Sequence, residues 1–261
     1  METCRYIDTH AHLSMLTHDS LSEILERAAK ANIVKMVTVS TEESNWKPCS
    51  EIAAVHPHVY FALGVHPHEA HRWVEWKTLL AAWFPANKPP AKCVAIGETG
   101  LDFHYSLSPK EAQIQAFEDQ VRLAKLTNLP LIIHSRNAFP ELYASLKSVG
   151  LGRRGAVLHC FTGTYEEAKQ GLELGLKISF SGILSFKNAT ELRQTAARLP
   201  VSELLIETDC PYLAPNPFRG KPNEPSFLPE TAKVLAEQLR IPLALLSEKL
   251  FEQSVRFFEL C

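Results

Sequence analysis

The chain has 261 residues and a formal net charge of −2, from 27 basic and 29 acidic side chains. One (β/α)₈ barrel needs about 250 residues, so we expect residues 1–261 to form a single domain. The nearly balanced charge excludes a large basic surface that grips long duplex nucleic acid, although a small cleft that binds a few phosphates is allowed.

The cysteine pattern and the hydropathy indicate the cellular setting. None of the six cysteines belongs to a CxxC pair, which favours reduced thiols over a disulfide framework. No basic and apolar leader opens the chain, and no apolar run approaches the roughly 20 residues of a membrane span. We therefore expect a cytoplasmic protein without membrane association, monomeric by default and without an obligate protein partner.

Strand and helix patterns alternate along the whole chain. The predicted strands are rich in Val, Ile and Leu without strict alternation, which is typical of parallel strands buried on both faces. Eight are expected, at residues 5–9, 34–39, 59–65, 93–97, 130–134, 155–159, 176–181 and 203–207. This order predicts an α/β fold of the TIM-barrel type. A doubly wound open sheet is the alternative, but its Gly-rich nucleotide-binding turn is absent.

Several sequence signals mark the starts of helices between these strands. Capping boxes are predicted at residues 20–23 and 164–167, and residues 108–111 add a proline at the first helical position. A Pro-rich loop follows the eighth strand, from Pro211 to Pro229. Two further helices are expected near residues 229–240 and 243–259.

Five of the predicted strands end in residues that can bind metal ions. His10 and His12 end the first strand, where side chains two residues apart point the same way and can meet one ion. The carboxyl ends of barrel strands meet at one rim, so residues at these ends should converge. The candidate ligands are His10, His12, Glu98, His134, His159 and Asp209. This set is large enough for a two-metal hydrolase.

The two carboxylates in this set are also candidate catalytic residues. Each oxygen of Glu98 can serve a different cation, and Asp209 can hold an ion while accepting a proton from water. No GxSxG nucleophile motif is present, so water is the expected nucleophile. Four imidazoles suit Zn²⁺ or Mn²⁺, whereas Mg²⁺ prefers oxygen ligands. We expect two divalent ions per subunit, Mg²⁺ or Mn²⁺ during turnover, in a site that can also take Zn²⁺.

The strand-end motifs resemble those of the TatD family of metal-dependent deoxyribonucleases, within the amidohydrolase-like barrels. The matching segments run in family order and are residues 8–13, 64–68, 97–103, 133–136, 159–163, 207–213 and 219–225. The resemblance implies the same six ligands, with Glu98 bridging, and 3′-to-5′ exonuclease activity on DNA with Mg²⁺ or Mn²⁺ in a mostly cytoplasmic setting. His104 departs from the pattern, because many members carry an aromatic residue there.

Residues for substrate binding are also suggested. The resemblance favours His66 in the substrate pocket, whereas His68 is expected to be exposed. Arg136 lies two residues past His134 on the same side, where it could hold a phosphate bidentately or pair with a carboxylate at the rim. Arg219, in the loop after the eighth strand, could line the cleft together with Lys221 and Asn223.

Asp8 and Glu207 stand next to the candidate ligands. Each could orient a metal-binding histidine through a hydrogen bond to the second ring nitrogen, or could be a structural acid. The sequence leaves both roles open.

Three functions are compatible with these residues. The leading prediction is a hydrolase that trims short or single-stranded DNA ends. The alternative keeps the site but hydrolyses D-aminoacyl-tRNA, or another ester or amide, because the same metal-activated water serves all of these. A catalytically dead binding scaffold is the third, and the intact ligand set argues against it.

Overall fold

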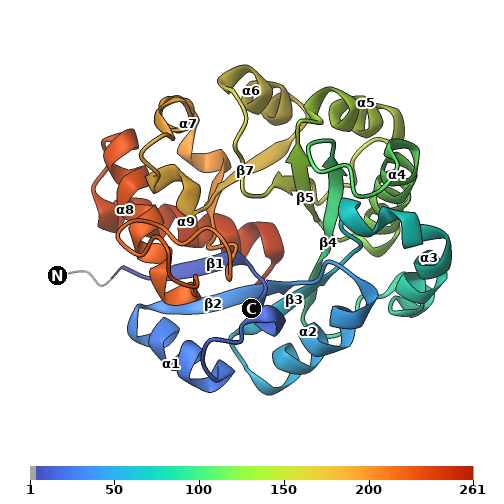
Figure 1. The fold of residues 1–261 in the computed structure, drawn as a ribbon, viewed down its shortest axis with the longest axis horizontal. Helices are drawn as coiled ribbons and strands as arrows, with labels where there is room; N and C mark the ends of the chain where they lie inside the picture. Colours follow the sequence, from blue (N-terminus) through green and yellow to red (C-terminus); the bar gives the residue numbers. More distant parts are fainter. Residues whose placement is uncertain (1–3, 261) are drawn as a thin grey trace.

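The computed structural model describes residues 4–260 and confirms the TIM-barrel prediction. Eight parallel strands form one sheet in chain order, and helices surround it (Figure 1). The strands are β1 (Tyr6–Ala11), β2 (Ile33–Val39), β3 (Val59–Leu63), β4 (Cys93–Asp102), β5 (Leu131–Arg136), β6 (Ala156–Leu158), β7 (Leu176–Phe180) and β8 (Leu204–Ile206).

The α-helices occupy the segments between the strands and after the last one. They are α1 (Leu21–Lys30), α2 (Glu43–Val55), α3 (Trp73–Ala82), α4 (Lys110–Thr127), α5 (Phe139–Val149), α6 (Tyr165–Glu173), α7 (Thr190–Ala196), α8 (Leu228–Leu239) and α9 (Leu243–Phe258). The predicted capping boxes are present at the starts of α1 and α6.

The predicted start of α4 was wrong in detail. The helix begins at Lys110, so Pro109 precedes its first residue and no side chain caps it. The hydroxyl of Ser108 donates instead to the carbonyl oxygen of His68, at 2.7 Å. Ser108 therefore fastens the start of α4 to the loop after β3.

Strand β4 is longer than predicted and reaches Asp102. It pairs with β5 up to Arg136, with a register irregularity between Ile96 and Thr99. At Gly100 the two strands approach so closely that a Cβ atom would lie 2.0 Å from the carbonyl oxygen of His134. The extension places the side chains of Glu98 and Asp102 on either side of this close approach.

Backbone and side-chain hydrogen bonds join the first strand to the segment that follows the last. Asp209 N–H donates to His10 O at 2.9 Å, and His12 N–H donates to Cys210 O at 2.8 Å. The hydroxyl of Thr9 donates to Ile206 O at 2.9 Å. The N-terminal and C-terminal strands of the barrel are thus fixed side by side.

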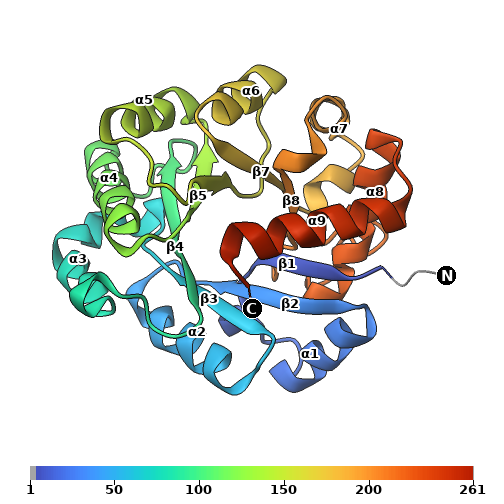
Figure 2. The ribbon, with the colours of Figure 1, turned by 180° about the vertical axis from the view of Figure 1, so that it is seen from behind.

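Apolar side chains fill both the space between sheet and helices and the interior of the barrel. The interior cluster includes Ile7, Val39, Ala95, Ile132 and Leu205, all buried. Phe257 and Phe258 at the end of α9 join it, and Arg154, just before β6, donates to the carbonyl oxygen of Phe257 at 2.8 Å. Figure 2 shows α9 beside β1 and β8 at this end. It closes the amino-terminal end of the barrel.

Two further expectations concern the whole chain. The five cysteines among residues 4–260 form no disulfide, and Cys261 lies outside the described residues. Within the same part of the chain, every helix is too short or too polar to cross a bilayer.

Candidate metal centre

A cavity of about 710 Å³ opens over the carboxyl ends of the strands. Five of the six expected ligands line it, and the sixth, His10, is fully buried beside them. The ligands come from β1 and the residue after it, from β4 and β5, and from the segments after β6 and β8. The structure therefore brings together residues that lie up to 199 positions apart in the chain, between His10 and Asp209.

The first donor group joins His10 and His12 to two carboxylates. The Nε2 atoms of His10 and His12 are 3.2 Å apart. Glu98 Oε2 lies 3.4 Å from His10 Nε2, and Asp209 Oδ1 lies 3.4 Å from His12 Nε2. Because His12 Nδ1 faces Val39 O at 2.9 Å and carries the ring proton, its Nε2 lone pair points into this group.

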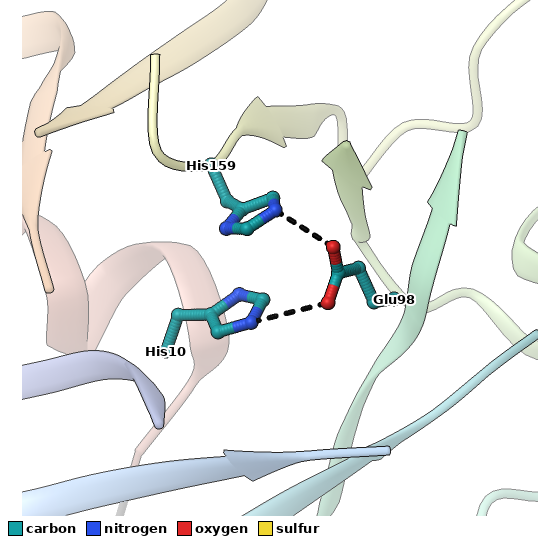
Figure 3. Close-up of side chains that lie close together, drawn as sticks. All are labelled: His10, Glu98 and His159. Atoms are coloured by element: carbon teal, nitrogen blue, oxygen red, sulfur yellow. Dashed lines mark ion pairs between the residues drawn. The ribbon is translucent and has the colours of Figure 1, made fainter. Parts of the chain in front are cut away.

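The second donor group lies on the other oxygen of Glu98. Glu98 Oε1 is 2.8 Å from His159 Nε2 and 3.2 Å from His134 Nδ1. Figure 3 shows the result, with one carboxylate oxygen directed to His159 and the other to His10. Glu98 is therefore the shared member of both groups.

The spacing of these atoms fits a divalent cation. Four ligands at about 2.1 Å from a tetrahedral ion are about 3.4 Å from one another. In the first group, the five pairs that involve a histidine lie between 3.2 and 3.7 Å. Imidazole nitrogens and carboxylate oxygens are also the donors that Zn²⁺ and Mn²⁺ accept. The donor types and these separations thus suit a divalent cation.

The electrostatic environment keeps both carboxylates ionised. Burial on its own would raise the pKa of Glu98, but His159 and the other imidazoles around the carboxylate hold this pKa well below its usual range. Burial would likewise raise the pKa of the Asp209 carboxyl group, but the neighbouring imidazoles of His12, His10 and His159 lower it. Negative charge at the centre of a histidine cluster is suited to holding cations.

The chain is similar to known proteins along almost its whole length. A sequence family described as "TatD related DNase" matches residues 7–259. The metal-dependent hydrolase YabD of Bacillus subtilis is 37% identical over 254 residues, which cover 97% of this chain and 98% of YabD. The chain belongs to the TatD family of metal-dependent hydrolases.

Solved structures agree with this assignment. The crystal structure of YjjV, a TatD homologue from Escherichia coli, superposes with a TM-score of 0.92 at 34% identity and covers 99% of this chain and 100% of YjjV. An amidohydrolase from Saccharomyces cerevisiae shares the fold, with a TM-score of 0.81 at 19% identity over 98% of this chain and all of its own. This chain therefore shares its fold with a solved TatD homologue.

The two acids beside the TatD ligands have different partners. Glu207 Oε1 lies 3.2 Å from His159 Nδ1 and accepts from Cys160 N–H at 2.6 Å, so it orients a ligand ring. Asp8 binds the backbone N–H and the hydroxyl of Thr208, at 2.9 and 2.6 Å, and contacts no imidazole. Asp8 thereby fixes the segment that carries Asp209.

His66 faces Glu98 as a hydrogen-bond donor. Its Nδ1 accepts the backbone N–H of His68 at 3.1 Å, so the proton of the neutral ring is on Nε2, which lies 3.2 Å from Glu98 Oε1. Burial lowers the pKa of His66 to about 4, and the ring is neutral at neutral pH. His68 is not simply exposed as expected, because its Nε2 lies 2.9 Å from Asp102 Oδ2.

The two arginines expected to bind substrate occupy different places. Arg136 lines the cavity and stacks over Tyr105, with 4.8 Å from its Cζ atom to the ring centre, and it pairs with no carboxylate among residues 4–260. Arg219 stacks over Phe186, with 3.9 Å from its Cζ atom to the ring centre, and it does not line the cavity. Asn223 is buried and donates to Thr208 O and Tyr212 O, which holds the loop rather than lining the cleft.

Sequence reasoning missed two kinds of residue at this site. Tyr105 and Tyr212 each expose 53% of their surface at the cavity wall, and solvent-exposed tyrosines in loops carry no periodic signal. Asp102 is fully buried between His68 and His134. Its place in the 97–103 motif was the available signal, but the predicted end of the strand at residue 97 left it in a loop.

Proposed function

We propose that this TatD-family hydrolase removes nucleotides from the 3′ end of single-stranded DNA, using two divalent ions, Mg²⁺ or Mn²⁺. The observation that carries the proposal is the shared carboxylate of Glu98, which lies between two donor groups at the base of one cavity. Ions spaced roughly 3.5–4 Å apart on such a carboxylate are typical of phosphodiester hydrolysis. The description of the matching family as "TatD related DNase" supports the substrate.

The cavity wall supports a short nucleic-acid end as the substrate. Arg136 presents a guanidinium group at the mouth, where it can contact a phosphate with two parallel hydrogen bonds. Tyr105 and Tyr212 expose aromatic rings at the same wall, and such rings stack on nucleobases regardless of sequence. A net charge of −2 suits a single strand entering by its end better than a long duplex lying along the surface.

In the proposed mechanism, the protein positions the reactants and moves one proton. Bound divalent ions lower the pKa of water and neutralise charge on the phosphodiester. His10, His12 and Asp209 would hold one ion and His134 with His159 the other, with Glu98 shared. The ionised Asp209 carboxylate accepts the proton of the attacking water. His66 donates its Nε2 proton to Glu98 Oε1 and shields this carboxylate from bulk water.

End-labelled oligonucleotides test the proposal. The protein, freed of metal and then supplied with Mn²⁺, should shorten single-stranded DNA stepwise from the 3′ end, and EDTA should abolish this. A Glu98→Gln preparation purified in the same way should be inactive, which excludes a contaminating nuclease. Shortening from the 5′ end would contradict the polarity. Rapid deacylation of D-aminoacyl-tRNA without DNA cleavage would show that the same site acts on the alternative substrate.

A further inference from the structure

Asp102 is fully buried and contacts both the candidate ligand His134 and the backbone of Tyr105 in the cavity wall. Its two carboxylate oxygens have separate tasks. Oδ1 accepts the backbone N–H groups of His104 and Tyr105, each at 2.9 Å. Oδ2 lies 2.9 Å from His68 Nε2 and 3.2 Å from His134 Nε2. One oxygen therefore caps a loop, and the other contacts two imidazole rings.

The backbone of Asp102 is fixed from a second direction. The buried side chain of Gln113, on α4, accepts the N–H of Asp102 at 2.8 Å and donates to its carbonyl oxygen at 3.1 Å. This amide clamp and the strand pairing to Arg136 hold the backbone of Asp102. The two N–H groups that Oδ1 accepts hold the carboxylate, and they direct Oδ2 toward the imidazoles.

A carboxylate oxygen lies 3.2 Å from each ring nitrogen of His134, Asp102 Oδ2 at Nε2 and Glu98 Oε1 at Nδ1. When a cation lies between Nδ1 and Glu98, the proton of the neutral ring is on Nε2, and Oδ2 of Asp102 accepts it. Nδ1 of the same ring lies 3.2 Å from Glu98 Oε1 and 3.4 Å from His159 Nε2. A ring with its proton held on Nε2 can offer the Nδ1 lone pair to an ion, and a ring with the opposite tautomer cannot.

We propose that Asp102 is a positioning residue of the metal centre, which holds His134 in the Nε2–H tautomer with Nδ1 directed at the donor group of Glu98 and His159. Oδ2 of Asp102 also contacts His68, so the carboxylate links the second donor group to the loop after β3. The inference rests on the metal-binding part of the proposed function and does not depend on the substrate.

Asp102→Asn separates the two tasks of the carboxylate. The amide oxygen can still accept from the His104 and Tyr105 N–H groups, so the loop is retained. The amide NH₂ then faces the histidines and donates where Oδ2 accepted, which favours the proton of His134 on Nδ1. We expect the second donor group, which contains His134, to bind an ion about 10–100-fold more weakly. Losses of this size are typical when the carboxylate partner of a metal-binding histidine is removed.

Titration calorimetry of the metal-free protein with Mn²⁺ alone measures this effect without any activity assay. The matched control is Asp119→Asn on α4, where the carboxylate accepts from Trp73 Nε1 at 2.9 Å outside the cavity, and it should bind Mn²⁺ as the unmodified protein does. Asp102→Asn that folds cooperatively and binds Mn²⁺ with unchanged affinity would overturn the proposal.

A second measurement uses the unmodified chain, so that it does not depend on the folding of a variant. Long-range ¹H–¹⁵N spectra of the Zn²⁺-loaded protein report the tautomer of each histidine, and the signal of His134 is assigned by its loss in His134→Asn. The proposal requires the Nε2–H tautomer. An Nδ1–H signal for His134 would refute it, and this outcome would leave the nuclease assignment standing.

Discussion

Asp209 N–H donates to the carbonyl oxygen of His10 across 2.9 Å, so two candidate ligands are tied to each other through their backbones. One residue follows the last strand of the barrel and the other belongs to the first. Their side chains meet only because these strands are adjacent. The backbone of Asp209 has φ of 59°, in the left-handed region that aspartate and asparagine tolerate better than most residues.

This geometry makes Asp209→Asn a clean test of the proposed base. Asparagine accepts the same backbone conformation but cannot take a proton from water, so we expect kcat to fall about 10²–10⁴-fold. Substrate binding, measured by fluorescence anisotropy with a labelled oligonucleotide, should change little. Asp119→Asn is the control for the same chemical change elsewhere. A variant that keeps near-normal kcat with its metals in place would require another base.

Removal of the metal should destabilise the folded chain. An ion that binds only the native state stabilises it by about 2.7 kcal/mol at a hundred times its Kd, or roughly 5–10 °C in Tm for a chain of this size. Thermal melts monitored by circular dichroism, with EDTA and after return of Mn²⁺, measure the difference. Melting temperatures that coincide in the two conditions would show that the donor groups bind no ion tightly.

Arg136→Ala should weaken substrate binding more than it slows turnover. The loss of one phosphate contact to a single strand reduces the slope of log affinity against log salt by about 0.7. Lysine should restore affinity only in part, because it lacks the planar fork of the guanidinium group. Anisotropy titrations at several salt concentrations give both values. Arg219→Ala provides the comparison, and an equal effect there would mean that the loop after β8 also contacts DNA.

A partly buried ion pair holds the loop after β8. Arg27 on α1 donates to both oxygens of Glu224, with its Nη2 2.5 Å from Oε2. The side chain of Glu224 is only 5% exposed. Arg27→Ala leaves this buried carboxylate without its main partner, so we expect a loss of about 1–3 kcal/mol in the free energy of unfolding. Urea titrations measure it. Arg122→Ala, which removes only exposed pairs on α4, should cost less than about 1 kcal/mol.

The same pair predicts how stability depends on acidity. Burial would raise the pKa of Glu224, but hydrogen bonds from Arg27, Ser226 and His18 hold it below the usual value. A lowered pKa in the folded state means that the stabilisation is complete above the unfolded pKa of about 4.3 and is lost as pH falls through the folded value. Glu224→Gln should therefore flatten the decline in urea stability below pH 4.5. If the variant lost stability below pH 4.5 as steeply as the unmodified protein, a group other than Glu224 would be responsible for the decline.

The fold and the six candidate ligands could be read from the sequence because both leave local signals. Each strand is a short apolar run, and a polar residue at its end interrupts the run at the rim of the barrel. His10 and His12 show their shared direction by spacing alone. These patterns depend on a few neighbouring residues, so no knowledge of distant contacts was needed.

The features that could not be predicted from the sequence depend on contacts between distant segments. Residues 97–102 contain two glycines and two acids, which conceal the strand that pairs with β5 as far as Asp102. Asn223 and Glu224 looked like members of a polar loop, yet both are buried. The partner of Glu224, Arg27, lies 197 residues away, and only the closed barrel brings them together.

The closed floor of the barrel has a consequence for the order of events in catalysis. Phe257 and Phe258 complete an apolar plug beneath the ligands, so the cavity opens on the opposite side, over the carboxyl ends of the strands. Substrate and product would both pass through this side. In the proposed reaction, the released fragment has to leave before the shortened strand can advance. Product accumulating in solution will compete with incoming substrate, and its inhibition of turnover should be competitive.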